Sequence, residues 1–236
     1  MDHDQRAENG WERDAQQLMV HGRDREAAEL AVRHLRGDQT DPTAPTRGDI
    51  SVGPLEQLDE LEPLLGSIAS GITPSDLDAP TPCANFTVRG VLGHMISGAT
   101  QFAAAFRGEP VPDVPADIAD GTDVVARAGA ALGGLMAAIR SPGALDRTVA
   151  APFGDMPGDA FARFVVLDGL VHGWDLATAT GQTYEPSDAL VAAVDGFARQ
   201  AIAPAMRDGD TFADAVELPA GATPIERLAA FTGRDV

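Results

Sequence analysis

The sequence of 236 residues contains no lysine, so all 17 of its basic side chains are arginines. The arginines are outnumbered by 36 aspartates and glutamates, which gives a formal net charge of −19. A surface with such an excess of negative charge repels the phosphates of nucleic acids and of anionic lipids. We therefore expect neither a nucleic acid nor a membrane among the partners of this protein.

Cysteine is also scarce, because Cys83 is the only one. A single cysteine excludes an internal disulfide and is typical of a protein that works in a reducing compartment. The sequence has no apolar run long enough to cross a bilayer. Its first residues also lack the basic and apolar regions of a signal peptide. We therefore expect a cytoplasmic protein without a transmembrane helix.

Residues 1–50 differ in character from the rest of the chain. Residues 24–36 match one short, charged and isolated helix, which would be marginally stable alone. Residues 37–53 are rich in Asp, Thr, Pro and Gly and are typical of a linker. We expect residues 1–50 to form an extension that is disordered or loosely docked, and residues 51–236 to form the folded domain. Three histidines fall in this extension and are not expected to bind metal: His3, His21 and His34.

Beyond the linker the apolar residues follow the helical period of 3.6. The expected helices cover residues 54–71, 88–106, 122–140, 159–180, 188–203 and 224–232. Pro63 should kink or interrupt the first of them. Thr87 and Ser187 are placed as N-caps, and Gly181 as the residue that ends a helix. Residues 148–158 should be irregular or briefly extended, and no alternating strand series appears. We predict an all-α protein, a four-helix bundle with short additional helices.

The segment Phe164–Asp175 is too apolar for a surface helix, yet it carries Asp168 and His172. Side chains four residues apart on a helix point the same way, with Cβ atoms roughly 5–6 Å apart. A buried carboxylate is costly unless it is paired or bound to a cation. His94 lies on another expected helix, and two facing helices of a bundle can bring such side chains together. We predict a divalent metal held by His94, Asp168 and His172, with open coordination positions. A buried Asp–His hydrogen bond would satisfy both groups without a metal, and the spacing alone does not decide between the two.

Three separate segments resemble one family. Residues 81–89, TPCANFTVR, followed by His94, are similar to the TPC-x-x-W-T-V-R…H signature of the DinB-like, mycothiol-dependent maleylpyruvate isomerase-related metal-binding proteins. Residues 168–181, DGLVHGWDLATATG, resemble the second signature, which ends in HGWDLA-x-x-TG. Residues 226–235, ERLAAFTGRD, resemble the closing RL-x-AF-x-GRD segment, and residues 152–158 match a loop that these proteins carry. The resemblance runs from the first expected helix to the end of the chain.

The resemblance implies a DinB-like four-helix bundle with a divalent metal, often zinc, near one end. Carried over by position, the metal ligands are His94, Asp168 and His172. This chain departs from the isomerase in three respects. The isomerase has Glu where this chain has Asp168, it has Trp where this chain has Phe86, and it carries a further C-terminal domain. These departures leave the bundle intact and place the isomerisation of maleylpyruvate itself in question.

Several other residues have two readings that the sequence leaves open. Cys83 lies shortly before a helix N-terminus that would lower its pKa, as a thiol nucleophile requires, or it packs as a small apolar residue. Asp175 either hydrogen-bonds a metal-bound imidazole or lies on the surface. Arg227 and Arg234 either bind an anionic substrate or form ion pairs that hold the C-terminal segment. Trp174 is expected in the core.

Two classes of function fit these features. The first is a metal-dependent transferase or isomerase whose partners are a small electrophilic substrate and a low-molecular-weight thiol, mycothiol by analogy. Coordination would make that thiol a thiolate near neutral pH. The second is a non-catalytic metal-binding protein, an accessory or stress protein that would form a homodimer. A serine or cysteine hydrolase is excluded, because the chain lacks a Gly-x-Ser-x-Gly elbow and a Cys–His pair in sequence reach.

Overall fold

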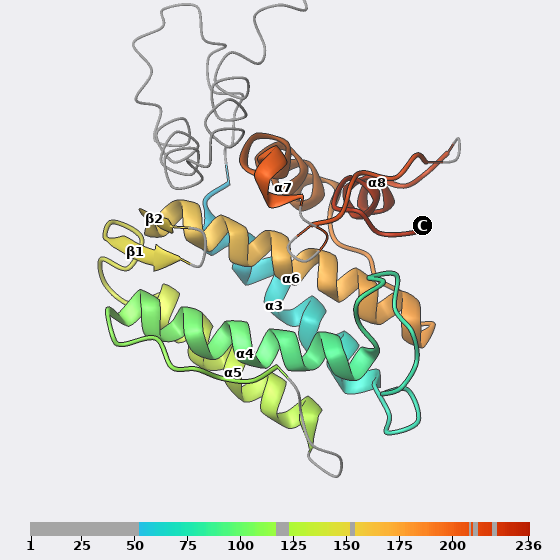
Figure 1. Ribbon diagram of the computed structural model, residues 1–236, viewed down its shortest axis with the longest axis horizontal. Helices are drawn as coiled ribbons and strands as arrows, with labels where there is room; N and C mark the ends of the chain where they lie inside the picture. The colour runs from blue at the N-terminus through green and yellow to red at the C-terminus, as the bar shows by residue number, and fades with distance from the viewer. Residues whose placement is uncertain (1–51, 117–122, 152–153, 208, 210–211, 219–220) are drawn as a thin grey trace, which may run out of the picture.

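The computed structural model describes residues 52–116, 123–151, 154–207, 209, 212–218 and 221–236. Within these residues the protein is mostly helical, with six α-helices, one short 3-10 helix and a two-stranded sheet (Figure 1). The elements are α3 (Pro54–Gly71), α4 (Val88–Arg107), α5 (Val124–Ile139), β1 (Thr148–Ala151), β2 (Gly154–Pro157), α6 (Gly158–Thr180), α7 (Asp188–Ala201), η1 (Pro204–Met206) and α8 (Pro224–Phe231). None of the described helices is long and apolar enough to span a membrane. The expected extension, with its helix at residues 24–36, lies outside the described residues.

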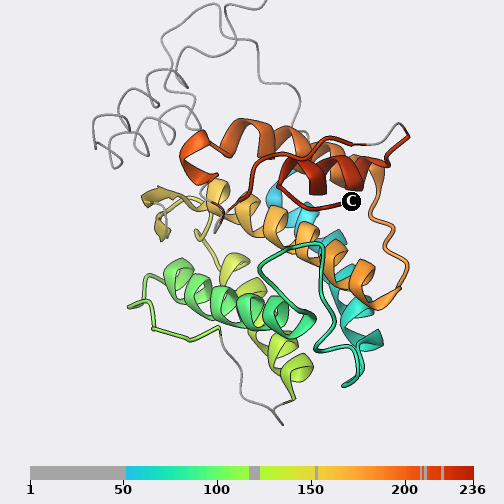
Figure 2. The same ribbon diagram turned by 45° about the vertical axis from the view of Figure 1, so that its right-hand side comes forward.

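Helix α6 occupies the centre of the described structure and is buried on nearly every side. A helix that is apolar around its whole circumference needs neighbours all around it. Figures 1 and 2 show how this need is met: α4 and α5 lie on one side of α6, and α7 and α8 lie on the other. Helix α3 packs along α6, and α4 packs along α5. The expected apolar character of this segment therefore corresponds to its central position.

Two glycines on one face of α6 allow this close packing. A Cβ atom added at Gly169 would lie 2.9 Å from Cδ2 of Leu61 on α3. A Cβ atom added at Gly173 would lie 2.5 Å from Oη of Tyr184, whose hydroxyl donates a hydrogen bond to the Leu170 carbonyl at 3.1 Å. The glycines are four residues apart and therefore share a face, one position along the helix from Asp168 and His172.

The helix boundaries follow the capping residues that the sequence indicates. The Thr87 hydroxyl accepts a hydrogen bond from the Gly90 amide at 3.2 Å, and Ser187 caps α7 in the same way. Gly181 adopts a left-handed conformation with φ of 66° and ends α6. Pro63 does not interrupt α3, which continues from Pro54 to Gly71. Pro63 lies on the exposed face of α3, so the backbone carbonyl that loses its partner is on the side of the solvent.

The small sheet is an addition to the expected all-α architecture. Strands β1 and β2 pair antiparallel, with buried Val149 opposite buried Met156. The segment 148–158 was expected to be irregular or briefly extended. Strands of four residues hold too few alternations for periodicity to reveal them, so the pairing could not be read from the pattern.

Candidate metal centre

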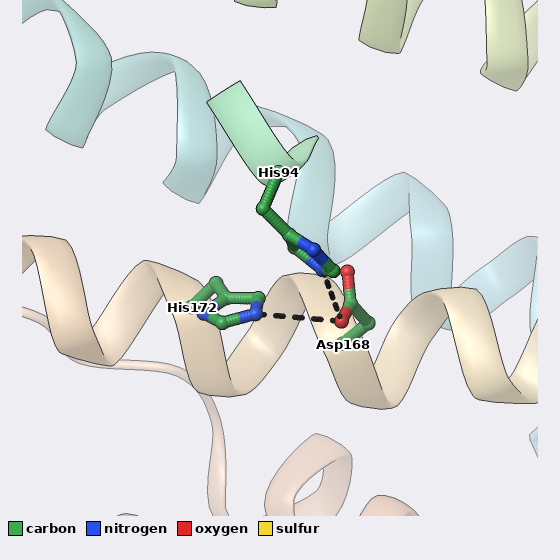
Figure 3. A group of neighbouring side chains, drawn as sticks. All are labelled: His94, Asp168 and His172. Atoms are coloured by element: carbon green, nitrogen blue, oxygen red, sulfur yellow. Dashed lines mark hydrogen bonds and ion pairs between the residues drawn. The ribbon is translucent and has the colours of Figure 1, made fainter. Parts of the chain in front are cut away.

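His94, Asp168 and His172 lie together where α4 meets α6 (Figure 3). Nε2 of His94 is 3.3 Å from Oδ1 of Asp168, and Nε2 of His172 is 3.5 Å from the same oxygen. One donor atom from each residue lies within 4.8 Å of the other two, and the two imidazole ring centres are 4.9 Å apart. The structure thus brings together all three residues that the sequence analysis selected, although His94 and Asp168 are 74 positions apart in the chain.

The local sequence explains why these side chains converge. Asp168 and His172 are one turn apart on α6, so they share a face of that helix. His94 lies between the buried residues Val91 and Met95 on the side of α4 that faces the core. The site is open on one side: the side chains of His94 and Asp168 are 37% and 41% exposed, whereas that of His172 is 5% exposed.

The three groups perturb one another's protonation. Loss of hydration opposes the charge on Asp168, but the imidazoles of His172 and His94 outweigh it and hold the pKa of Asp168 well below its ordinary value. Loss of hydration also acts to lower the pKa of His94. The Asp168 carboxylate outweighs that effect, so the pKa of His94 is raised above 6.5. The centre therefore favours positive charge beside one carboxylate oxygen.

The second ring nitrogen of His172 is bound by Asp175. Nδ1 of His172 is 2.9 Å from Oδ2 of Asp175, and the Asp175 side chain has no exposed surface. Of the two readings of Asp175, the structure therefore supports the hydrogen bond to an imidazole and contradicts the surface carboxylate. Nδ1 is the donor of this bond, so in neutral His172 the lone pair is on Nε2, which faces Asp168. Trp174 is buried, as expected.

Phe86 and Cys83 come from the loop that precedes α4. The Phe86 ring centre is 5.5 Å from that of His94 and 6.2 Å from that of His172, so this ring contacts both histidines. Cys83 is half-buried and is not one of the converging donors. Of the two readings of Cys83, the structure favours the small packed residue over the thiol nucleophile. Burial raises the pKa of the Cys83 thiol, and the nearby positive charge of Arg234 offsets this only in part.

The two arginines near the end of the chain differ. Arg234 is buried, and its Nη2 lies 3.3 Å from Oδ2 of Asp175, which agrees with the expected ion pair. Arg227 instead donates a hydrogen bond to the backbone carbonyl of Ala222. An apolar cavity of about 20 Å³ lies beside Asp168, and its lining includes Met95.

The sequence analysis missed two features around the site. Neither the contact of Phe86 with both imidazoles nor the contact of Tyr184 with α6 was anticipated. The position of Phe86 directly before the N-cap of the helix that carries His94 was the available signal. Tyr184 gave no comparable signal, because its contact depends on how the segment after α6 folds back.

Comparison with known proteins identifies the family. The model of the mycothiol maleylpyruvate isomerase N-terminal domain matches residues 58–177, which is just over half of the chain. The chain belongs to this family. Similar proteins include two uncharacterized proteins of Mycobacterium tuberculosis, one from strain CDC 1551 / Oshkosh and one from strain H37Rv. Each is 31% identical to this chain over 184 residues, which are 78% of this chain and 98% of the relative. No solved structure gives a significant match.

The segment that matches this family, residues 58–177, contains Asp175 and the three residues of the candidate metal centre. Arg234 lies beyond this segment. The interaction between Arg234 and Asp175 thus joins the matched segment to a later part of the chain.

Proposed function

We propose that His94, Asp168 and His172 bind one divalent metal ion, and the types of donor favour zinc. Two imidazoles and one carboxylate, with one open side, are a donor set suited to a catalytic divalent metal. Bonds of about 2.0–2.1 Å to a tetrahedral metal place neighbouring ligand atoms about 3.3–3.5 Å apart. The separations of 3.3 and 3.5 Å from Asp168 Oδ1 to the two Nε2 atoms agree with this spacing.

The observation that carries the proposal is the orientation of His172. With its Nδ1–H directed at Asp175, a neutral His172 turns the lone pair of Nε2 toward the Asp168 carboxylate at 3.5 Å. A lone pair and an anion at this distance repel each other unless a cation lies between them. A proton can fill that role, and so can a metal. The Asp175 carboxylate that binds Nδ1 favours the metal, because this hydrogen bond fixes the His172 ring and strengthens Nε2 as a metal ligand.

We propose further that α3, α4, α5 and α6 form a DinB-like four-helix bundle. The mutual packing of α3 with α6 and of α4 with α5, together with the family, supports this arrangement. Residues 51–236 are then one domain and residues 1–50 an extension of it. A bundle of this kind carries its metal between facing helices, where side chains of α4 and α6 converge.

The reaction that best fits is the attack of a low-molecular-weight thiol, mycothiol in this family, on a small electrophile in the cytoplasm. A divalent metal bound here would lower the pKa of a coordinated thiol and so supply a thiolate near neutral pH. The residues of the chain bind and orient: Asp175 fixes the His172 ring, and Phe86 forms an aromatic wall over both imidazoles. The exposed side of His94 and Asp168 leaves access for the thiol and the electrophile.

Metal analysis of the purified protein tests the binding step. We expect about one divalent ion per chain, and its loss in His94→Ala and in His172→Ala. The matched control is His34→Ala, the same chemical change in the proposed extension, which should retain the ion. Full metal occupancy in either of the first two variants would contradict the assignment of the ligands.

A cobalt-substituted sample tests the thiol step. Titration with mycothiol, or with a simpler thiol, should produce a sulfur-to-metal charge-transfer absorption band, and the same titration of Asp168→Asn should not. A cobalt spectrum that no thiol changes would refute the thiol-dependent reaction. It would leave the alternative of a non-catalytic metal-binding accessory or stress protein.

A further inference from the structure

Arg234 is a buried arginine that reaches the candidate metal centre from the segment after α8. Its Nη2 and Nε lie 3.3 and 3.4 Å from Oδ2 of Asp175, and its Nη1 donates to the Thr232 carbonyl at 3.1 Å. Oδ2 of Asp175 also accepts the hydrogen bond from Nδ1 of His172 at 2.9 Å. Oδ2 of Asp175 thus connects the C-terminal segment, through Arg234, to His172.

The local backbone is shaped to deliver this side chain. Gly233 has φ of 90°, a conformation that L side chains rarely adopt, and a Cβ atom there would lie 2.5 Å from Cβ of Ala213. The preceding residue, Thr232, is buried and caps the end of α8 through its hydroxyl, which donates to the Ala229 carbonyl. The Arg234 amide also donates to the Ala229 carbonyl at 3.0 Å. The turn after α8 therefore directs Arg234 inward.

The ion pair between Arg234 and Asp175 is important because both side chains are buried. Asp175 has no exposed surface, and its Oδ1 has no hydrogen-bond partner among the described residues. The hydrogen bonds to the side chains of His172 and Arg234 all end on Oδ2. A buried carboxylate without a counter-charge is strongly unfavourable, and a guanidinium remains charged at any physiological pH. Without Arg234, Asp175 would lose the group that fixes its position and compensates its charge. His172 would then lose the acceptor that orients its ring.

We propose that Arg234 is a positioning residue of the metal centre, acting through Asp175 to hold Nε2 of His172 toward Asp168. This inference rests on the proposed metal site. It also makes the centre dependent on the docking of α8 and the residues after it, although the three ligands come only from α4 and α6. Arg234 itself contacts none of the three ligands through a described hydrogen bond.

The test is the zinc affinity of Arg234→Gln, measured by competition with a chromogenic chelator. Loss of a partner that orients a metal ligand lowers affinity by about 10–100-fold, so we expect a decrease in this range. The matched control is Arg207→Gln. Arg207 also holds the C-terminal segment, through the carbonyls of Ala213 and Phe231, but its described hydrogen bonds do not include Asp175. This control should keep its zinc affinity within about twofold.

A double-mutant cycle tests whether the effect passes through Asp175. In the Asp175→Asn background, the further change Arg234→Gln should cause little additional loss of zinc affinity. Equal losses in Arg234→Gln and Arg207→Gln, or additive losses in the double variant, would overturn the inference. Unchanged affinity in a folded Arg234→Gln protein would overturn it as well.

Nitrogen NMR of the metal-free protein gives a readout that does not require metal binding. At alkaline pH, His172 in the wild type should carry its proton on Nδ1, and Arg234→Gln should shift this tautomer population. If Arg234→Gln does not fold, Arg234→Lys takes its place. It retains the charge without the planar pair of donors and should still shift the tautomer population of His172 relative to the wild type. A wild type that binds no zinc would refute the proposed function, while the tautomer of His172 would still decide the role of Arg234. An unchanged tautomer population in the variant would overturn that role.

Discussion

Replacing Asp168 by Asn removes one of the three proposed ligands and its charge while nearly preserving its shape. Structural zinc sites with four ligands bind with apparent free energies of about 10–16 kcal/mol, or roughly 2.5–4 kcal/mol per ligand. At 1.36 kcal/mol for each factor of ten, Asp168→Asn should weaken metal binding by about two to three orders of magnitude. Competition with a chromogenic chelator measures this change directly.

The same substitution should have little effect on the metal-free protein. The Asp168 side chain is 41% exposed, and its partner His94 is 37% exposed, so water screens their ion pair. Pairs this exposed typically contribute about 0–1 kcal/mol to the free energy of unfolding. We therefore expect the metal-free variant and the metal-free wild type to unfold at similar temperatures.

The response to a chelator should then separate the two proteins. A metal present at about 1,000 times its Kd stabilises the folded state by about 4 kcal/mol, and a 100-fold weaker site loses about 2.7 kcal/mol of this. For a domain of 150–250 residues, each kcal/mol shifts Tm by about 2–4 °C, so the loss amounts to roughly 5–11 °C. Thermal unfolding with and without chelator should show a large shift for the wild type and a small one for Asp168→Asn.

Asp159→Asn is the matched control for this experiment. It makes the same chemical change on the same helix, where Asp159 is half-exposed and pairs with Arg163. Its metal affinity should equal that of the wild type. The reasoning would be refuted if Asp168→Asn kept the wild-type affinity, or if chelator lowered the Tm of Asp168→Asn and of the wild type equally.

Three further predictions follow from the described geometry. In the metal-free protein the pKa of His94 is raised above the unfolded-state value of about 6.5, so its ion pair with Asp168 stabilises the fold fully below that pH. This contribution to stability is lost as the pH rises through the higher folded-state pKa. An NMR titration of His94 with a midpoint at or below 6.5 would contradict this. Gly173→Ala should lower the free energy of unfolding by about 1–3 kcal/mol through its clash with Tyr184, whereas Gly196→Ala, which has open space, should not; equal stabilities of the two variants in denaturant would argue against the clash. Because burial raises the pKa of Cys83, its alkylation at pH 7 should be slower than that of a free cysteine, and a faster rate would contradict the described environment.

The sequence predicted the helices well because their signals are local. Thr87 and Ser187 were assigned as N-caps and Gly181 as the end of a helix, and each has that role in the structure. Helical periodicity and capping chemistry depend on residues within a few positions of one another, so they survive without knowledge of the tertiary fold. The four-residue strands β1 and β2 lack such a signal, and they were not predicted as a pair.

For the candidate site, the spacing placed Asp168 and His172 on one face, but the spacing alone did not bring His94 to them. The resemblance to the family and the single remaining histidine on another helix supported that choice. The roles of Asp175 and Arg234 depend on which sides of α6 are covered by the C-terminal segment, which is a tertiary property. The choice between the two readings of Cys83 also needed the tertiary structure, because burial raises the pKa of its thiol.

Two stripes of residues lie next to each other on α6, and this arrangement limits which substitutions the helix can accept. Asp168 and His172, the two proposed ligands on this helix, each precede a glycine, Gly169 or Gly173, where an added Cβ atom would lie within 3 Å of a neighbouring side chain. Turning α6 about its axis to re-aim Asp168 and His172 would also turn the glycine face away from Leu61 of α3 and from Tyr184. Substitutions near the candidate metal centre are therefore less constrained outside this helix, at positions such as Phe86, which borders the centre from a loop. Substitution of Phe86 should therefore change the surroundings of the two imidazoles while the packing of α6 against α3 stays as it is.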